Sequence, residues 1–329
     1  MDVSLKFSYP PLQGGKGLSE EQVAIFQRDG YLIIPNALDP ETVASLLAET
    51  HNMLENFSLE DHPMTKFSAG ETTEHVGDDY FLNSGNKIRF FFEEGEPVSV
   101  PYIPVVHISQ QLDAFDSAGN LTKPKAKAIN KIGHYLHGLS APFAALLSSS
   151  AAHSPGAIAR SLGFRSPECL QSMIICKQPE IGGAVPPHQD STFLYTDPPS
   201  AVGFWYALED ATVENGCLSF LAGSHKTAEV EKRFVRKVTG VGTEFIVNEG
   251  KRFPLGDGFG KGKTDGEYTI GEVKAGSLVL IHGNILHKSE KNVSEKGRII
   301  YTFHVIEGEG VMYDERNWLQ PPEKGFTKL

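Results

Sequence analysis

Cysteine is scarce in this sequence. Among its 329 residues there are only three cysteines, Cys169, Cys176 and Cys217. An odd number of cysteines without a Cys-x-x-Cys spacing argues against a disulfide framework and against a zinc site built from cysteine pairs. We therefore expect packed free thiols in a reducing compartment.

Long hydrophobic runs are also missing. No apolar stretch approaches the roughly 20 residues that span a bilayer, and the first residues hold no run of signal-peptide length. We expect no membrane span and a cytoplasmic protein. The last three residues, Thr327-Lys328-Leu329, differ from the Ser-Lys-Leu peroxisomal signal only at the first position, so the peroxisome is the alternative compartment.

The chain has fewer basic residues than acidic ones. The chain has 30 lysines and arginines against 41 acidic residues, and its formal net charge is −11. A surface of this kind is unsuited to the phosphates of nucleic acids or to anionic lipid, so we predict no nucleic-acid partner. The expected partner is a small-molecule substrate, and an anionic substrate would need a local basic pocket.

Hydrophobic residues make up 40% of the chain and charged residues 22%, a composition typical of globular proteins. No repeat or linker divides the sequence, so we predict a single domain over residues 1–329. Ser19 with Gln22 forms a capping box, and Asp39-Pro40 marks a second helix start. An alanine- and leucine-rich stretch at about 126–162 is typical of further helix. We expect helical support over about 16–165.

Short β-prone runs dominate beyond residue 166, with glycine, proline and Asn-Gly between them. They lie at 171–177, 202–208, 217–221, 277–281 and 298–305. Many short strands with long connections indicate a sandwich, a jelly roll or a barrel, with its core over about 166–310. Asn215-Gly216 predicts a hairpin turn, and the glycine-rich stretch 238–272 predicts a long surface loop.

His188 and Asp190 are two positions apart. On an extended strand this spacing places the imidazole and the carboxylate on the same face, as a metal site needs. Gly182-Gly183 and Pro186-Pro187 precede the pair, so we expect it at a strand end near a pocket. A lone His-x-Asp pair is more often a hydrogen-bonded surface feature, and only a third ligand makes it a metal prediction.

Two histidines follow the apolar run at 277–281, and either could be that third ligand. We choose His287, with His282 as the rival. Two histidines and one carboxylate leave three coordination positions open, which suits ferrous iron in oxygen-activating enzymes, whereas structural zinc prefers a closed set. The open positions would take O2 and the keto-carboxylate of 2-oxoglutarate.

Arg298 stands shortly after His287, at the head of the next predicted strand. A guanidinium binds a carboxylate through two parallel hydrogen bonds, so Arg298 is predicted to hold the far carboxylate of 2-oxoglutarate. By itself this residue would be a surface arginine after a turn. His225, His282 and His304 lack a carboxylate at strand spacing, and we predict supporting roles for them.

The sequence resembles the phytanoyl-CoA dioxygenase family of Fe(II)/2-oxoglutarate oxygenases over nearly its whole length. The resemblance is carried by short motifs that are specific in combination. They are DYFLNSG (79–85), KIRFFFE (87–93), INKIGH (129–134), QSM (171–173), KQP (177–179), PHQD (187–190), EDAT (209–212), ENGCL (214–218), GSH (223–225) and HKS (287–289).

The resemblance implies a mainly β fold, a double-stranded β-helix of the cupin-like jelly-roll type with supporting N-terminal helices. It assigns the iron ligands and the residues of the 2-oxoglutarate pocket: His188, Asp190 and His287, then Lys131, Met173, Trp205, Ser289 and Arg298. Residues 114–127 and 238–272 diverge from the family pattern, so the substrate does not transfer with the fold.

The expected activity is hydroxylation of a small organic or lipid-like substrate, with 2-oxoglutarate and O2 consumed and succinate and CO2 released. A lipid acid, an acyl-CoA and a small metabolite all remain open as substrates. The alternative is a sensor or scaffold of the same fold that binds metal and 2-oxoglutarate without turnover.

Overall fold

The computed structural model describes residues 17–67, 78–93, 114–116, 118–149, 153–254 and 266–329. The α-helices of this part lie in the first half of the chain. They are α1 (Glu20–Asp29), α2 (Pro40–Asn56), α3 (Asp79–Leu82), α4 (Leu136–Leu139), α5 (Ala141–Leu147) and α6 (Pro155–Ser161). The 3-10 helices are η2 (Lys125–Lys127), η3 (Asp190–Thr192) and η4 (Ser224–Lys226).

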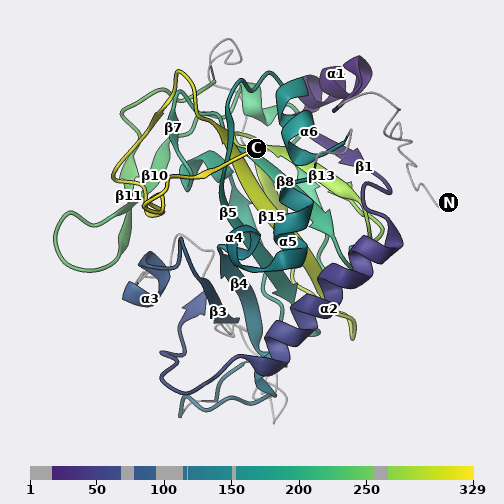
Figure 1. Ribbon diagram of the computed structural model, residues 1–329, viewed down its shortest axis with the longest axis vertical. Coiled ribbons are helices and arrows are strands. Elements are labelled where there is room, and N and C mark those ends of the chain that lie inside the picture. The colour runs from purple at the N-terminus through teal and green to yellow at the C-terminus, as the bar shows by residue number, and fades with distance from the viewer. Residues whose placement is uncertain (1–16, 68–77, 94–113, 117, 150–152, 255–265) are drawn as a thin grey trace.

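A large sheet forms the centre of the molecule (Figure 1), and all its pairings are antiparallel except that of β2 with β3. Its strands follow the order β1-β13-β8-β15-β5-β4-β3-β2, with β17 also paired to β5. Their bounds are β1 (Tyr31–Ile34), β13 (Leu278–His282), β8 (Val202–Ala207), β15 (Arg298–Glu307), β5 (Pro167–Lys177), β4 (Ile129–His134), β3 (Ile88–Glu93), β2 (Lys66–Phe67) and β17 (Thr327–Lys328).

A smaller antiparallel sheet has the order β12-β9-β14-β6. Its strands are β12 (Thr269–Gly271), β9 (Leu218–Phe220), β14 (His287–Ser289) and β6 (Val185–His188). Leu218 and Phe220 of this sheet share a buried cluster with Trp205, Val279 and Ile300 of the large sheet, so the two sheets pack face to face. This double-sheet arrangement confirms the predicted mainly β jelly-roll fold.

Two further strand pairs complete the β structure: β10 (Lys232–Arg236) with β11 (Thr243–Val247), and β7 (Thr196–Asp197) with β16 (Met312–Tyr313). Helices cover the other face of the large sheet, where Figure 1 shows α4, α5 and α6 in front of the strands. Phe143 of α5 and Ile158 of α6 pack into one cluster with Phe204 and Phe303 of the sheet. The site-bearing strands are thus held between a helical layer and the smaller sheet.

The N-terminal signals are confirmed. Ser19 caps α1, with Gln22 reaching back to the cap, and Gly30 ends the helix at a φ of 82°. Asp39 caps α2, which has its proline in the first turn. β1 follows α1 directly and pairs with β13, so this helical entry is joined to the large sheet.

The prediction of helical structure over about 126–162 is wrong in its first part. Residues Ile129–His134 form β4, between β3 and β5 of the large sheet. Because Lys131 and Ile132 pair with Ile175 and Ile174 of β5, tertiary pairing overrides the local helical preference. The strands β2, β3 and β4 also show that the region 16–165 contributes to the sheet as well as to helical support, which is consistent with the single domain that we propose.

Two loop predictions also need correction. The stretch 238–272 contains β11 and β12 as well as loop, and part of it lies outside the described residues. Asn215-Gly216 does not form a hairpin turn, since β8 and β9 on either side belong to different sheets. Gly216 has a φ of 81°, but the Asn215 side chain instead accepts a hydrogen bond from Thr212 N at 2.8 Å and closes a local turn.

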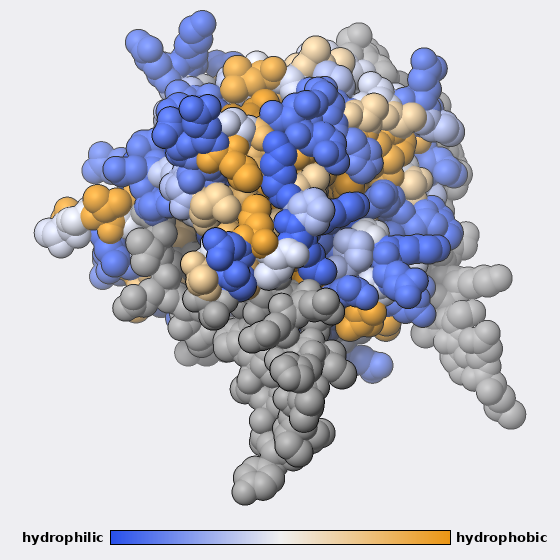
Figure 2. All heavy atoms as spheres, turned by 90° about the horizontal axis from the view of Figure 1, so that it is seen from below, coloured by the Kyte–Doolittle hydropathy of each residue, from blue (hydrophilic) through white to orange (hydrophobic). Residues whose placement is uncertain are grey.

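On the face shown in Figure 2, apolar side chains lie in small groups separated by hydrophilic ones. None of the helices in the described ranges meets the length and hydrophobicity that a membrane span requires. At the C-terminus, β17 pairs with Cys169 and Glu168 of β5, and Arg160 Nη2 donates to Leu329 O at 2.6 Å. A peroxisomal role for Thr327-Lys328-Leu329 therefore requires that this strand leave the sheet.

Substitution of Gly30 tests how tightly the junction between α1 and β1 is packed. A Cβ added there would lie 2.4 Å from His225 Nδ1, whereas one added at Gly119, with a similar φ of 83°, meets nothing within 4 Å. We expect Gly119→Ala to cost about 1–2 kcal/mol of unfolding free energy from backbone strain alone, and Gly30→Ala to cost about 1–3 kcal/mol more from overpacking. Urea unfolding measures both, and equal losses would contradict this packing.

Candidate metal and 2-oxoglutarate site

Three predicted ligand side chains converge on one point. His188 Nε2 lies 3.5 Å and His287 Nε2 3.7 Å from Asp190 Oδ1. Ligand atoms about 2.1 Å from a shared ion lie roughly 3.0 Å apart at right angles and roughly 4.2 Å apart when opposite. The observed distances fall between these limits, so one ion can be reached by all three side chains. Among the described residues, this is the group of His, Cys, Asp and Glu side chains that could hold a metal.

The smaller sheet brings these residues together. His188 ends β6 and is the register partner of His287 on β14, and their rings lie 4.2 Å apart. The expected single extended strand is not quite what forms, because β6 ends at His188 and η3 begins at Asp190. The turn of η3 carries the carboxylate back toward both rings. His282, the rival ligand, lies elsewhere, with its ring 4.8 Å from that of His225.

The hydrogen bonds of the two imidazoles leave the correct nitrogen atoms for a metal. His188 Nδ1 lies 2.9 Å from Pro186 O, and His287 Nδ1 lies 3.1 Å from Ile285 O. Since a carbonyl can only accept, each Nδ1 carries the hydrogen. When Nε2 carries no proton, it holds a lone pair that faces Asp190. Burial lowers the pKa of His188, but the hydrogen bond and the charge of Asp190 outweigh burial and raise that pKa, so a metal would replace a proton on this ring. The donor set therefore fits a divalent cation such as iron.

The Asp190 carboxyl is ionised, and His304 contacts one of its two oxygens. Burial alone would raise the pKa of its carboxyl, but His287, His304 and His188 outweigh burial and hold that pKa well below its usual range. His304 Nε2 lies 3.1 Å from Asp190 Oδ2, which leaves Oδ1 for the shared point. Burial lowers the pKa of His287 to about 4, so this ring is neutral near pH 7. His304 thus has the supporting role that the sequence predicted.

A cavity of about 180 Å³ opens beside the three ligands. Every residue predicted for the 2-oxoglutarate pocket lines it: Lys131, Met173, Trp205, Ser289 and Arg298. They come from β4, β5, β8, β14 and β15, strands of both sheets. Burial lowers the pKa of Lys131 well below its usual value. The five residues predicted for the 2-oxoglutarate pocket thus lie in one cavity with the three predicted metal ligands.

Arg298 is a buried cation whose hydrogen bonds are incomplete. Its side chain is 2% exposed, and Nη1 donates to Gly216 O at 2.7 Å. Nε has no hydrogen-bond partner among the described residues, and no ion pair to Arg298 occurs there either. Burial lowers its pKa to about 10, so the guanidinium remains charged at neutral pH. A buried charge of this kind requires an anion, which the far carboxylate of 2-oxoglutarate would supply.

Lys177 is a supporting residue that sequence reasoning missed. Its ammonium donates to Ser289 Oγ at 2.9 Å, to Gly183 O at 2.8 Å and to Glu290 O at 2.6 Å. Because the Ser289 oxygen accepts from Lys177, its own hydrogen is free to donate into the cavity. The only sequence signal was the KQP motif, which gives no hint that β5 and β14 meet at this point.

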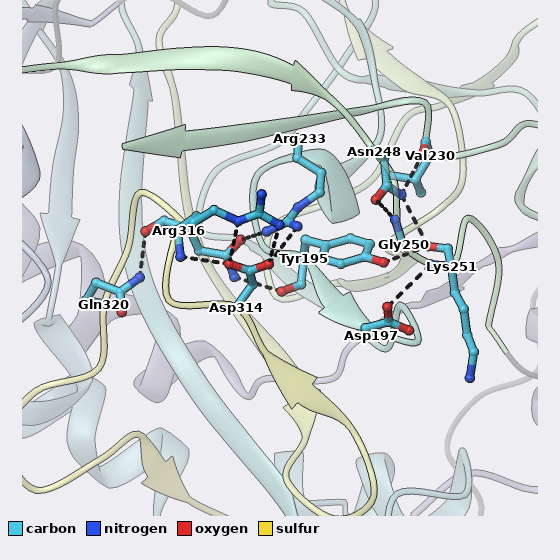
Figure 3. Close-up of polar contacts among 11 residues, drawn as sticks. Tyr195, Asp197, Val230, Arg233, Asn248, Gly250, Lys251, Asp314, Arg316 and Gln320 are labelled. Carbon is cyan, nitrogen blue, oxygen red and sulfur yellow. Dashed lines mark hydrogen bonds and ion pairs between the residues drawn. The ribbon is translucent and has the colours of Figure 1, made fainter. Parts of the chain in front are cut away.

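A buried polar network fixes another part of the cavity wall (Figure 3). Arg233 Nη1 contacts Asp314 Oδ2 at 2.7 Å, Arg233 Nη2 donates to Asn317 Oδ1 at 3.1 Å, and the guanidinium lies over the Tyr195 ring. Asn317 Nδ2 donates to Tyr195 O at 2.7 Å. The chain neighbours Phe234, Trp318 and Leu194 all line the cavity. The network therefore ties three cavity-lining segments to one another.

The Arg233–Asp314 pair provides a stability test. The Arg233 side chain is buried and that of Asp314 is 11% exposed, and Arg233→Met would leave Asp314 without its internal partner, at an expected cost of about 3–5 kcal/mol of unfolding free energy. Arg316 contacts the same carboxylate oxygen at 3.0 Å, but its side chain is 49% exposed. We expect Arg316→Met to cost no more than about 1 kcal/mol. Denaturant unfolding measures the free energy of unfolding of both variants. Similar losses of this free energy would show that the Arg233–Asp314 pair stabilises the fold no more than the Arg316–Asp314 pair does.

Known proteins resemble this chain in sequence and in fold. A family model described as Phytanoyl-CoA dioxygenase (PhyH) matches residues 26–101 and 105–300. The chain is 41% identical over 319 residues to phytanoyl-CoA dioxygenase domain-containing protein 1 of Bos taurus, which covers 95% of this chain and 98% of that protein.

Solved structures show the same fold at low sequence identity. The non-heme alpha ketoglutarate dependent carbocyclase SnoK from nogalamycin biosynthesis matches with a TM-score of 0.56 at 17% identity, covering 96% of this chain and 100% of that one. The epimerase SnoN, solved in complex with Fe3+, alpha ketoglutarate and nogalamycin RO, matches with a TM-score of 0.54 at 15% identity, covering 94% and 97%.

Proposed function

The chain belongs to the phytanoyl-CoA dioxygenase family, and on that premise we propose that it is an Fe(II)- and 2-oxoglutarate-dependent dioxygenase. It hydroxylates a small organic or lipid-like substrate and releases succinate and CO2. The observation that supports this most strongly is the pairing, in one cavity, of a three-residue metal cluster with a buried guanidinium that has no anionic partner among the described residues.

His188, Asp190 and His287 would hold the metal. They supply two neutral nitrogen ligands and one charged oxygen, which is the set that suits ferrous iron in oxygen-activating enzymes. When bound, iron with 2-oxoglutarate and O2 supplies the oxidising chemistry that replaces a substrate C–H bond by C–OH. His304 keeps Asp190 ionised and oriented, so the carboxylate presents Oδ1 to the metal and not to solvent.

Arg298 and Ser289 would bind the far carboxylate of 2-oxoglutarate. Arg298 offers charged donors from the head of β15, and Ser289 offers a hydroxyl hydrogen that Lys177 leaves free. Met173 and Trp205 are buried apolar residues in the same wall and would keep water from the bound cosubstrate. Lys131 adds a buried amine to this wall, and burial lowers its pKa well below the usual value. The charged guanidinium of Arg298 would compensate the locally buried anion, although the whole molecule is acidic.

The direct test measures succinate. The purified chain is supplied with Fe(II), 2-oxoglutarate, O2 and a panel of organic acids, acyl-CoA thioesters and neutral metabolites. We expect succinate formation that requires all three reactants and rises with one class of compound, and none from His188→Ala. Product formation without O2 or 2-oxoglutarate would contradict the proposal. Silence across the panel with retained metal and 2-oxoglutarate binding would favour the sensor or scaffold alternative.

Metal-binding measurements distinguish His287 from His282, the rival ligand. His287→Ala should weaken Mn(II) binding by more than the roughly 10- to 100-fold that losing a group behind a ligand costs. His282→Ala should leave it unchanged, because His282 lies against His225 away from the cluster. Titration followed by electron paramagnetic resonance gives both affinities without any need for substrate. An equal loss in the two variants would remove His287 from the ligand set.

Arg298→Leu should raise the KM for 2-oxoglutarate by roughly 10- to 100-fold, since a hydrogen bond to a charged group is worth about 1.5–3 kcal/mol. Lys288→Met is the matched control, because Lys288 also lines the cavity but already pairs with Glu290 at 2.6 Å. Initial rates of succinate formation give both constants. An unchanged KM in Arg298→Leu with normal Mn(II) affinity would show that the cosubstrate binds elsewhere.

A further inference from the structure

The cavity wall carries two buried hydrogen-bond acceptors that have no partner among the described residues. They are His134 Nε2 and Gln171 Oε1. Both residues line the cavity of the proposed active site, and they are 1% and 5% exposed. Buried polar atoms in folded proteins are nearly always hydrogen-bonded, so these two need a group that the chain itself does not provide.

The hydrogen bonds of Ser84 show which ring nitrogen of His134 carries the hydrogen. Ser84 Oγ lies 2.5 Å from Phe81 O, a carbonyl that can only accept, so the hydroxyl hydrogen is committed to it. Ser84 Oγ therefore accepts from His134 Nδ1, 2.7 Å away. The hydrogen of the neutral ring is on Nδ1, and Nε2 carries a lone pair. Burial, with a further effect of Lys131, lowers the pKa of His134 well below its usual value, which keeps the ring neutral.

The amide group of Gln171 is oriented by His304. Asp190 Oδ2 accepts from His304 Nε2 at 3.1 Å, and the amide nitrogen of Gln171 lies 3.5 Å from His304 Nδ1. The amide oxygen of Gln171 is the atom without a partner among the described residues, and an amide oxygen can only accept.

The two acceptors come from neighbouring strands, and aromatic rings lie beside His134. His134 on β4 is the register partner of Ser172 on β5, and Gln171 precedes Ser172 on that strand. The His134 ring lies 5.7 Å from that of Phe81 and 5.1 Å from that of Trp318, and both of these rings line the cavity. An occupant here meets two acceptors and an apolar, aromatic surface.

We propose that His134 and Gln171 select the substrate by accepting hydrogen bonds from its hydroxyl or amine groups, while Phe81 and Trp318 pack against its apolar body. The substrate class is therefore a small, largely apolar alcohol or amine. A carboxylate or phosphate placed against these two acceptors would find no hydrogen-bond donor in either of them, so such a group is disfavoured at this position. This inference rests on the proposed function, since it places the substrate in the cavity beside the metal cluster.

Matched fragments on a common ring test the donor requirement. Cyclohexylmethanol and cyclohexylmethylamine carry donors, whereas methoxymethylcyclohexane and cyclohexanecarboxylate carry none at pH 7. Their dissociation constants are measured by ligand-observed NMR with the full chain, Mn(II) and 2-oxoglutarate. We expect the alcohol and the amine to bind about three- to tenfold more tightly than the ether, and the carboxylate to bind most weakly.

Variants assign the preference to His134. His134→Phe keeps a ring but removes the acceptor and should abolish the difference between alcohol and ether, while His134→Gln keeps an acceptor and should retain part of it. Equal binding of alcohol and ether to the unmodified chain, no binding of either donor fragment, or a preference that survives in His134→Phe would overturn the inference. The comparison in the unmodified chain stands even if a variant fails to fold.

The same samples separate this inference from the proposed function. Mn(II) and 2-oxoglutarate affinities are measured alongside the fragments. A chain that binds both but shows no donor preference contradicts the inference alone. A chain that shows the preference but forms no succinate with any alcohol or amine contradicts the proposed turnover, while the selecting role of His134 and Gln171 stands.

Discussion

One buried carboxylate, that of Asp190, sets the arrangement of the site. An ionised carboxylate removed from water costs several kcal/mol unless its partners compensate. Here the compensation is divided: His304 holds one oxygen from behind, and His188 and His287 face the other. Both facing rings donate through Nδ1 to backbone carbonyls, so they offer lone pairs, and a divalent cation is the species that satisfies all three groups at once.

The positive counterpart of this charge is Arg298, in the wall of the same cavity. A cavity with a cation-binding cluster and a buried guanidinium requires a ligand that chelates a metal at one end and carries an anion at the other, and 2-oxoglutarate has this form. The smaller sheet connects the metal cluster with the anion site at Arg298. Its strand β14 supplies both His287 and Ser289, and β15 begins at Arg298 soon afterwards. On this proposal, a short stretch of chain would hold both ends of the cosubstrate.

Much of the site could be predicted because its signals are local. The His-x-Asp pair, a histidine after an apolar strand and an arginine at the head of the next strand can each be read within a few residues. The order of the strands could not be read this way. β4 was predicted as helix because its neighbourhood is rich in alanine and leucine, and only pairing with β3 and β5 makes it a strand. The supporting roles of Lys177, His134 and Gln171 depend on that same long-range strand register, so no local sequence pattern predicts them.

The division of the cavity explains how one fold can keep its cosubstrate and change its substrate. In the proposed arrangement, Ser289 on β14 and Arg298 on β15 would face the cosubstrate, whereas the substrate side combines acceptors that have no partner among the described residues with rings next to the Arg233 network. The most direct test of the central claim is a crystal structure of the chain with Mn(II) and 2-oxoglutarate, grown without O2. The account predicts one ion in contact with His188, Asp190 and His287, and the far carboxylate on Arg298. An ion bound by other residues, or 2-oxoglutarate outside this cavity, would contradict it.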